Sequence, residues 1–231
     1  MPNLLSLATS ILAAGFAWAT YFYFKDVYEP EPRRLLLTVF GAGMAAVGPA
    51  YLLYRLAERF GLGVELALDD DAAVRLAFCV LVVGTIEELC KFLPVLVLIG
   101  HHSDFDEPLD GIVYAAFGAL GFASMENFVI GRWLEGPELW GRLLASPLTH
   151  ALFAAVWGWS LSLDRFARPR RPGRVALGLL LAILVHGLYD FLVLSPWPGR
   201  LFGAGLVLLL WIVFFRVVSH ALKTSPHRPP A

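Results

Sequence analysis

The stretch 75–100 reads RLAFCVLVVGTIEELCKFLPVLVLIG, and it decides the fold class. It is long enough to cross a bilayer as a helix, which takes about 20 mostly apolar residues. Near its middle lie Glu87, Glu88 and Lys91. An ionised group at the centre of a membrane helix costs roughly 2.5–3.5 kcal/mol on insertion scales. These side chains must therefore face a protein interior or a wet cavity, and the stretch predicts a membrane helix that carries a polar site.

The rest of the chain has the composition of a membrane protein. Of the 231 residues, 58% are hydrophobic and only 16% are charged, whereas soluble domains are about half apolar and about a quarter charged. Seven apolar stretches are long enough to span a bilayer: residues 4–24, 35–57, 74–99, 111–131, 147–164, 174–194 and 200–219. We expect an all-α, polytopic bundle of about seven transmembrane helices, built as one integral membrane domain over residues 1–231 with a disordered tail at 224–231.

The distribution of Lys and Arg predicts the orientation in the bilayer. The first, third and fifth loops and the C-terminal end carry 11 of these residues, against 6 on the other side. Because cytoplasmic loops are enriched in Lys and Arg, we expect a cytoplasmic C-terminus and an N-terminus outside. No Lys or Arg precedes residues 4–24, so this run is read as a retained helix rather than a signal peptide. A net charge of -1 gives no basic footprint for nucleic acid.

Three further predicted spans carry polar residues. Glu126 and Asn127 lie near the end of 111–131. The span at 147–164 starts with Ser146 and Pro147, which we expect as N-cap and first helical residue, and His150 follows one turn later. In 174–194, His186 and Asp190 lie four residues apart on one helix face. A carboxylate there can fix the imidazole tautomer and leave the other ring nitrogen free.

The predicted topology brings these groups to a similar depth. The spans at 111–131 and 174–194 run outward and the span at 147–164 runs inward, so their polar residues fall in the outer half of the membrane. Glu87 and Glu88 lie nearby, close to the middle of the membrane. Separate ion pairs that only hold helices together would scatter in depth. We therefore expect one site built from Glu87, Glu88, Glu126, His150, His186 and Asp190.

Carboxylates and histidines around a water are the parts of a hydrolase. A glutamate can act as general base on water, with histidine as partner or oxyanion stabiliser, and two histidines with one carboxylate also suit catalytic zinc. The sequence has none of the H-E-x-x-H, G-x-S-G and G-x-G-D motifs that three other kinds of intramembrane protease need. The chemistry therefore points to hydrolysis without those signatures.

The residues resemble the PrsW family of intramembrane proteases. The elements are E-E-x-x-K at 87–91, F-x-x-x-E-N at 122–127, the histidine at 150 and H-x-x-x-D at 186–190, in the order typical of that family. The stretch Glu29-Pro30-Glu31-Pro32 is typical as well. The resemblance covers a four-helix catalytic core at about 74–194 and extends to the related CAAX prenyl proteases and APH-1-like proteins.

The resemblance implies proteolysis of a membrane-anchored protein substrate, such as an anti-sigma-factor-like regulator, in the cytoplasmic membrane of a prokaryote. It implies a metal, with zinc the expected ion, while the CAAX enzymes suggest that a Glu–His pair activates water without one. The implied roles fall on matching positions: catalytic Glu87 (the base), Glu88, His150 and His186; candidate metal ligands His150, His186 and Glu126; supporting Lys91, Asn127 and Asp190.

Two alternatives remain open at this level. An ion- or proton-coupled transporter also places Glu, Asp and His inside the membrane, and would favour broken helices in an inverted repeat. Pro94 could break the span at 74–99, but no matching partner is visible elsewhere in the sequence. A non-catalytic membrane scaffold is the other alternative, and the presence of every motif element argues against it.

Overall fold

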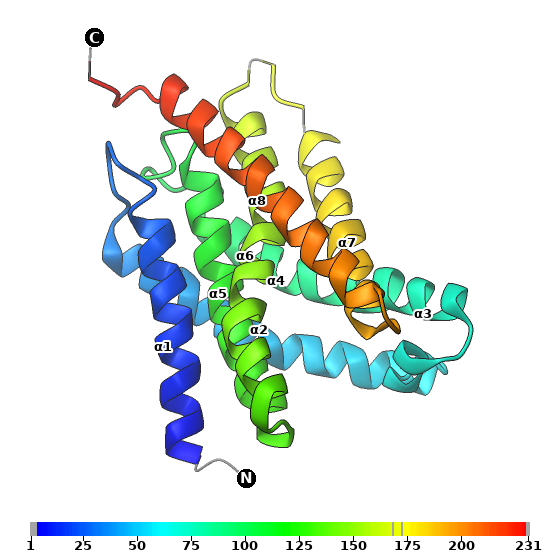
Figure 1. The fold of residues 1–231 in the computed structure, drawn as a ribbon. Helices are drawn as coiled ribbons and strands as arrows, with labels where there is room; N and C mark the ends of the chain where they lie inside the picture. Colours follow the sequence, from blue (N-terminus) through cyan, green and yellow to red (C-terminus); the bar gives the residue numbers. More distant parts are fainter. Residues whose placement is uncertain (1–3, 168, 172, 230–231) are drawn as a thin grey trace.

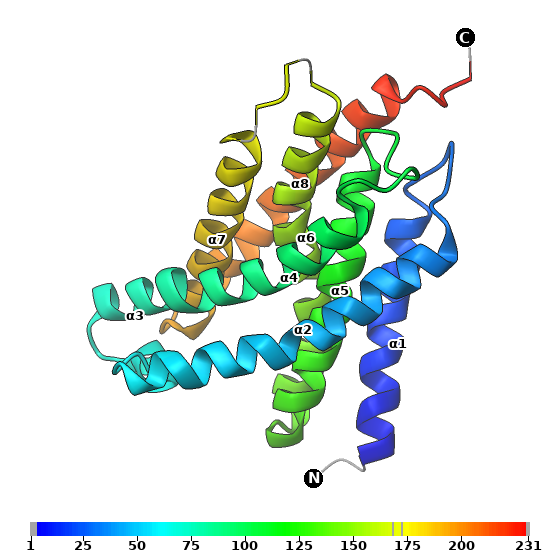
Figure 2. The ribbon, with the colours of Figure 1, turned by 180° about the vertical axis from the view of Figure 1, so that it is seen from behind.

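The computed structural model describes residues 4–167, 169–171 and 173–229, and this part of the chain contains helices and connecting loops but no strands (Figures 1 and 2). The all-α prediction is confirmed, and the seven predicted spans correspond to seven long helical segments. The helices are α1 (Leu4–Tyr23), α2 (Arg33–Arg59), α3 (Ala72–Phe78), α4 (Thr85–Ile99), α5 (Asp110–Ile130), α6 (Gly136–Arg165), α7 (Gly173–Leu194) and α8 (Gly199–Thr224), with short helical turns at Val64–Leu68, Cys79–Gly84 and Gly131–Trp133.

The chain is a multi-pass membrane protein arranged around α5. Among the described residues, α2, Asp110–Trp133, α7 and α8 are long and apolar enough to cross a membrane, and Leu7–Tyr23 is a shorter apolar helix. In the most apolar window of the helix Asp110–Trp133, 78% of the residues are buried, against 22% in α7 and 17% in α8. A helix that is apolar all round belongs inside a protein or in lipid. We therefore place α5 at the core and leave α7 and α8 to face lipid.

Helix α2 and the α3–α4 segment run across the upright helices α1, α5, α6 and α7 (Figures 1 and 2). Glycines allow α2 to approach α5 closely. A Cβ on Gly43 would lie 1.9 Å from the Gly118 carbonyl oxygen, and one on Gly121 would lie 1.9 Å from the Phe40 carbonyl oxygen. Small residues at such contacts let membrane helices pack backbone to backbone. This packing carries α2 beneath the start of α4, where the polar residues lie.

The predicted start of the fifth helix is wrong. Helix α6 begins at Gly136 rather than at Ser146, and Pro147 lies inside it. The extra turns are stabilised by apolar burial, because Leu139 and Leu143 pack in a cluster with α1. This gain outweighs the backbone hydrogen bond that an internal proline removes. The extension also turns residues expected in a loop into part of a helix that leads to the site.

Four chain segments meet at one end of the molecule: the α1–α2, α4–α5 and α6–α7 connections and the end of α8 (Figure 1). The tail that we expected to be disordered makes contacts as far as Arg228: the Ser225 hydroxyl donates a hydrogen bond to Glu107, His227 lies against Asp106, and the Arg228 amide donates to the Ser225 carbonyl oxygen. Residues 230–231 of that tail lie outside the described part of the chain.

Candidate active site

A π-helical turn at Cys79–Gly84 leads into α4 and positions its first carboxylates. Such turns insert an extra residue into a helix and occur often at functional sites. Here the turn packs against α7 at two glycines: a Cβ on Gly84 would lie 2.6 Å from the Ile183 carbonyl oxygen, and one on Gly187 would lie 2.4 Å from the Val80 Cα. Because Gly187 follows His186 directly, this contact holds the α7 histidine beside the first turn of α4.

Glu88 is fully buried, and both of its carboxylate oxygens have partners. Its Oε1 accepts hydrogen bonds from the Lys91 ammonium at 2.7 Å and lies 2.7 Å from His186 Nδ1. Its Oε2 accepts from the Trp157 indole N–H at 3.0 Å. A buried charge is tolerated when it is paired and hydrogen-bonded in this way. Glu88 therefore holds His186 and Lys91 in place, with both of its oxygens already hydrogen-bonded.

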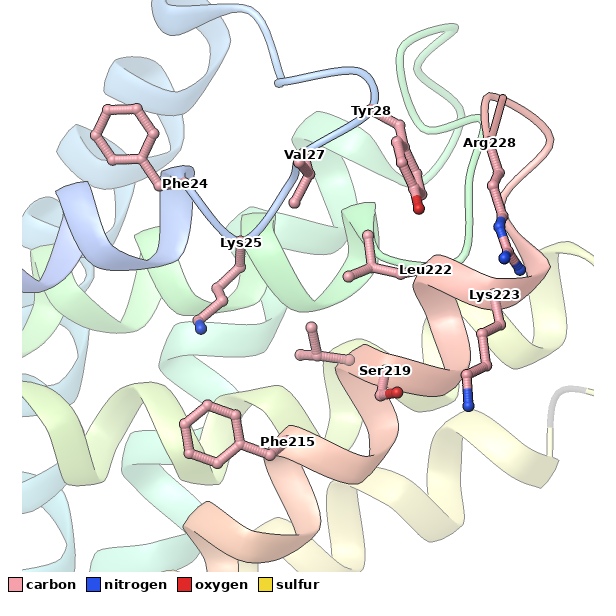
Figure 3. A pocket seen from close by; sticks show the side chains of 10 residues that line it. Phe24, Lys25, Val27, Tyr28, Phe215, Ser219, Leu222, Lys223 and Arg228 are labelled. Atoms are coloured by element: carbon pink, nitrogen blue, oxygen red, sulfur yellow. The ribbon is translucent and has the colours of Figure 1, made fainter. Parts of the chain in front are cut away.

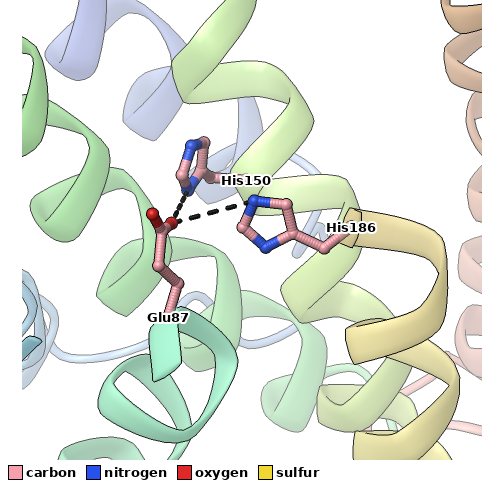
Figure 4. A group of neighbouring side chains, drawn as sticks. All are labelled: Glu87, His150 and His186. Carbon is pink, nitrogen blue, oxygen red and sulfur yellow. Dashed lines mark ion pairs between the residues drawn. The ribbon is translucent and has the colours of Figure 1, made fainter. Parts of the chain in front are cut away.

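One carboxylate oxygen of Glu87 makes no hydrogen bond to a described residue and lies 3.5 Å from the Lys91 ammonium. The Tyr54 hydroxyl from α2 donates to Glu87 Oε1 at 3.0 Å, whereas Oε2 has no hydrogen-bond partner among the described residues. Glu87 Oε2 lies 3.9 Å from His150 Nδ1 and 3.7 Å from His186 Nε2 (Figure 4). Three side chains from α4, α6 and α7 thus direct one oxygen and two nitrogens toward a common point.

The other nitrogens of the two imidazoles face carboxylates. His150 Nε2 lies 3.4 Å from Glu126 Oε2, while the Arg142 guanidinium donates to Glu126 Oε1 at 2.7 Å. His186 Nδ1 faces Glu88, as described above. A carboxylate on one ring nitrogen fixes the tautomer and leaves the opposite nitrogen with its lone pair. With Glu88 and Glu126 accepting the N–H protons of these nitrogens, both histidines would offer a lone pair on the side where Glu87 lies.

Asp190 lies on the same side of His186 as Glu87. Its Oδ2 is 3.4 Å from His186 Nε2, and its side chain is 26% exposed, against 7% for Glu87 and 0% for Glu88. We expected Asp190 to fix the tautomer of His186. In the structure Glu88 contacts Nδ1 of that ring instead, and Asp190 lies near Nε2. Asp190 is therefore the most accessible carboxylate of the group.

With every carboxylate ionised and both histidines neutral, the cluster would carry a net negative charge. Lys91 lies 2.7 Å from Glu88 and 3.5 Å from Glu87, with a side chain that is fully buried. With neutral histidines, two permanent cations meet four carboxylates: Lys91 and Arg142 against Glu87, Glu88, Glu126 and Asp190. Uncompensated buried charge is costly. A divalent cation would bring the total near zero.

The donor set fits a metal. Glu87, His150 and His186 each offer one ligand atom, these atoms lie within 4.8 Å of one another, and all three residues are buried. Glu87 Oε2 and His150 Nδ1 have no hydrogen-bond partner among the described residues. Two histidines and one carboxylate with an open fourth position are a ligand set of catalytic zinc. In the structure the carboxylate of this set is Glu87, whereas Glu126 lies next to the opposite ring nitrogen of His150, Nε2.

The structure brings together seven of the eight residues named from the sequence: Glu87, Glu88, Lys91, Glu126, His150, His186 and Asp190. The eighth, Asn127, is buried, and neither side-chain amide atom has a hydrogen-bond partner among the described residues.

Sequence reasoning missed three partners: Tyr54, Arg142 and Trp157. Arg142 was assigned to a loop because the start of α6 was placed too late. The tyrosine and the tryptophan sit in apolar runs, where nothing in the sequence separates a hydrogen-bonding aromatic residue from a packing one. Only the contacts with the glutamates reveal them.

A pocket lies outside this cluster, between the end of α1, the following loop and α8 (Figure 3). It is lined by apolar side chains such as Phe24, Phe215 and Leu222, and by the cationic ends of Lys25 and Lys223. None of the eight residues named above lines it. The candidate active site is therefore defined by the buried cluster and not by this pocket.

Comparison with known proteins relates this chain to intramembrane metalloproteases, which agrees with a buried site of carboxylates and histidines. The profile described as "PrsW family intramembrane metalloprotease" matches residues 31–218. The chain is 32% identical over 218 residues to Protease PrsW of Geobacillus kaustophilus, covering 94% of this chain and 92% of the relative. It is 34% identical over 191 residues to Protease PrsW of Bacillus subtilis, covering 80% and 83%. No solved structure matches the chain.

The matched region contains the buried cluster and all four helices that build it. The match covers well over half of the chain, and the relatives are similar over most of their own length. The chain belongs to the PrsW family of intramembrane metalloproteases.

Proposed function

We propose that this protease cuts membrane-anchored proteins with a water held at Glu87, His150 and His186. The observation that carries the proposal is the convergence of three donor atoms, of which Glu87 Oε2 and His150 Nδ1 have no partner among the described residues. A buried polar atom without a partner costs free energy. A bound water or metal would repay that cost.

The proposed roles follow from the contacts. Glu87 Oε2 either accepts the proton of the attacking water directly or holds the metal that would carry this water, while Tyr54 on Oε1 keeps the carboxylate turned toward the histidines. Glu88 and Glu126 set the tautomers of His186 and His150. A metal held by Glu87, His150 and His186 would lower the pKa of the water and polarise the scissile carbonyl. We take zinc as the ion, because the ligands are two imidazoles and a carboxylate.

We propose that two further residues contact the substrate. Asp190 is the most exposed carboxylate of the cluster, so it is the first to meet an incoming peptide. Asn127 has a buried amide without a partner among the described residues, which can hydrogen-bond the substrate backbone. We propose Asp190 and Asn127 as substrate-positioning residues, with Lys91 fixing the two glutamates.

We propose that the end of the molecule that holds the C-terminus is cytoplasmic. The α6–α7 connection at that end is rich in Arg, as the positive-inside rule requires. Glu126 lies at the opposite end of α5 from Asp110, which starts the helix at the proposed cytoplasmic side. Cleavage would then occur toward the outer face, on a substrate such as an anchored anti-sigma-factor-like regulator.

A cleavage assay tests the catalytic roles. The protein is co-expressed with tagged single-span membrane proteins, and fragments are followed by immunoblot. We expect Glu87→Gln, His150→Ala and His186→Ala each to reduce cleavage by about 100-fold or more, the usual range for removing a general base. Glu138→Gln, on the exposed start of α6, is the matched control and should cleave normally. Full cleavage by all three site variants, as folded proteins, would refute the proposal.

Metal analysis of the purified protein tests the ligand set separately. We expect about one zinc per chain in the wild type, its loss in His150→Ala and His186→Ala, and loss of cleavage on chelation that returns when zinc is added back. The distinction between Glu87 and Glu126 is read from the zinc content of Glu87→Gln and Glu126→Gln, and only the first should lose the ion. Wild-type cleavage that survives complete metal removal would instead favour water activation by the Glu–His pair alone.

A further inference from the structure

A second buried carboxylate cluster lies at the other end of α5, outside the active site. Asp26 follows α1, Glu107 lies in the α4–α5 loop, and Asp110 is the first residue of α5. These residues are 2%, 1% and 1% exposed. One carboxylate oxygen of each lies within 4.8 Å of those of the other two.

Each of the three carboxylates has one oxygen in use and one without a partner. Asp110 Oδ2 accepts from the backbone N–H groups of Asp106 and Glu107 at 2.8 and 2.7 Å. Glu107 Oε2 accepts from the Ser225 hydroxyl, and Asp26 Oδ1 accepts from the Glu29 N–H at 3.4 Å. Among the described residues, Asp26 Oδ2, Glu107 Oε1 and Asp110 Oδ1 have no hydrogen-bond partner. Each carboxylate is thus fixed by a hydrogen bond to one oxygen, while its other oxygen has no hydrogen-bond partner among the described residues.

The surroundings add a fourth buried carboxylate, while the charges of Arg165 and His227 act on Asp110 and Glu107 without forming an ion pair with them. Glu31 is 4% exposed and accepts a hydrogen bond from the Tyr114 hydroxyl. In the part of the chain that the structure describes, no lysine or arginine forms an ion pair with Asp26, Glu31, Glu107 or Asp110. Burial and the neighbouring Glu107 raise the pKa of Asp26 to about 7. Burial and Asp110 raise the pKa of Glu31 to about 10.

We propose that Asp26, Glu107 and Asp110 bind a divalent cation that prefers oxygen ligands, of the class of Ca²⁺, Mg²⁺ and Mn²⁺. Three buried carboxylates from separate segments offer only oxygen, which suits these ions better than zinc. Asp110 and Glu126 are sixteen residues apart on α5, about 24 Å along its axis. The cation site is therefore distinct from the cluster around Glu87.

A cation here would tie three chain segments together. Asp26 belongs to the α1–α2 loop, Glu107 to the α4–α5 loop and Asp110 to α5, while Ser225 brings in the C-terminal tail through Glu107. An ion that binds only the folded protein stabilises it by RT ln(1 + c/Kd), where c is the concentration of the free ion. We therefore expect the ion to raise the unfolding temperature of the whole bundle.

Thermal unfolding of the full chain in detergent tests the site. After chelation and gel filtration, Ca²⁺, Mg²⁺ and Mn²⁺ are added separately at millimolar concentration. The wild type should gain several degrees in unfolding temperature with at least one of them. Asp26→Asn and Glu107→Gln should lose that gain, whereas Glu87→Gln should keep it, because the readout does not depend on proteolysis. Retention in Glu87→Gln separates this result from the proposed active site.

A matched control lies in the same loop. Asp106 is exposed and pairs with His227 and, through it, with Glu29. Asp106→Asn should keep the cation-dependent gain. If Asp106→Asn loses it, the ion binds that exposed group and the proposal is wrong. The proposal is also wrong if none of the three ions shifts the wild type, or if the gain persists in Asp26→Asn and Glu107→Gln.

If the variants fail to fold, a second measurement tests the cation site. Binding of Mn²⁺ to the wild type is then followed by its electron paramagnetic resonance signal and compared with Glu107→Asp, which keeps the charge but shortens the side chain. Tight binding that weakens about tenfold or more in Glu107→Asp supports the site. Absence of bound Mn²⁺ in the wild type overturns it and leaves shared protons to stabilise the carboxylates.

Discussion

At the scale of single residues, the two adjacent glutamates perform different tasks. Glu88 uses both oxygens for Lys91, His186 and Trp157. Glu87 keeps Oε2 next to the histidines without a hydrogen bond to any described residue. The sequence places both in one turn and gives no basis for separating them, since neighbouring residues on a helix differ only by about 100° in direction. The two roles differ because Tyr54 of α2 contacts Glu87, whereas Trp157 of α6 and His186 of α7 contact Glu88.

The hydrogen bond between Trp157 and Glu88 predicts the effect of Trp157→Phe. The substitution keeps an aromatic ring but removes the N–H that reaches Glu88 Oε2 at 3.0 Å. Hydrogen bonds to charged groups contribute about 1.5–3 kcal/mol, so thermal unfolding in detergent should show a loss of that order. Trp159→Phe is the control, since Trp159 is half-buried and packs edge-on against His220. Equal effects of the two variants would contradict the role given to Trp157.

The charged residues of the site were predictable because ionised groups are costly, and therefore rare, inside a membrane. Glu87, His150 and His186 stand out in apolar runs, and helix periodicity with the topology count put them at one depth. Tyr54 and Trp157 could not be found this way, because tyrosine and tryptophan are common in membrane helices and the sequence does not show what their polar atoms contact. Their role depends on which helices meet.

At the scale of elements, the π-helical turn before α4 is the feature that fixes the site. It packs on α7 through Gly84 and Gly187, where added Cβ atoms would meet backbone atoms at 2.6 and 2.4 Å. Backbone cannot rotate away as a side chain can. The contact therefore sets the distance between the glutamates of α4 and His186.

The close contact at Gly187 predicts the effect of Gly187→Ala. The new methyl group would overlap Val80 and push α7 away from the turn. Overpacking of this kind costs typically about 1–3 kcal/mol, and the shift should also lower cleavage and zinc content, because His186 is the preceding residue. Gly205→Ala on α8, where a Cβ meets nothing within 4 Å, should leave cleavage and zinc content unchanged and should not lower the unfolding temperature. A Gly187→Ala protein with normal unfolding temperature and cleavage would contradict this account.

At the scale of the whole molecule, hydropathy predicted how many helical segments there are but not how they cross. Seven apolar runs became seven helical segments. The crossing of α2 over α5 depends on Gly43, Gly118 and Gly121, which the sequence does not pair. The start of α6 was misplaced because a Ser-Pro pair is a good local signal for a helix start, and packing of Leu139 and Leu143 on α1 overrode it.

The C-terminal tail joins distant parts of the chain through one histidine. His227 Nε2 lies 2.7 Å from Glu29 in the α1–α2 loop and 3.2 Å from Asp106 in the α4–α5 loop. Although the slight burial acts the other way, the hydrogen bond to Asp106 and the charge of Glu29 raise the pKa of His227 above its usual value. The charged form is therefore the one that the folded protein stabilises.

The raised pKa of His227 predicts that the tail docks more tightly in mild acid. A histidine whose pKa rises on folding contributes fully below its unfolded pKa near 6.5, and the contribution is lost as the pH rises through the higher folded value. Hydrogen exchange of the His227 and Arg228 amides, both bonded to Ser225, should show protection at pH 6 that falls by pH 8.5 after correction for intrinsic rates. In His227→Gln the protection should be low at both pH values. Equal protection of the wild type at pH 6 and 8.5 would mean that Ser225 and Glu107 hold the tail without the histidine.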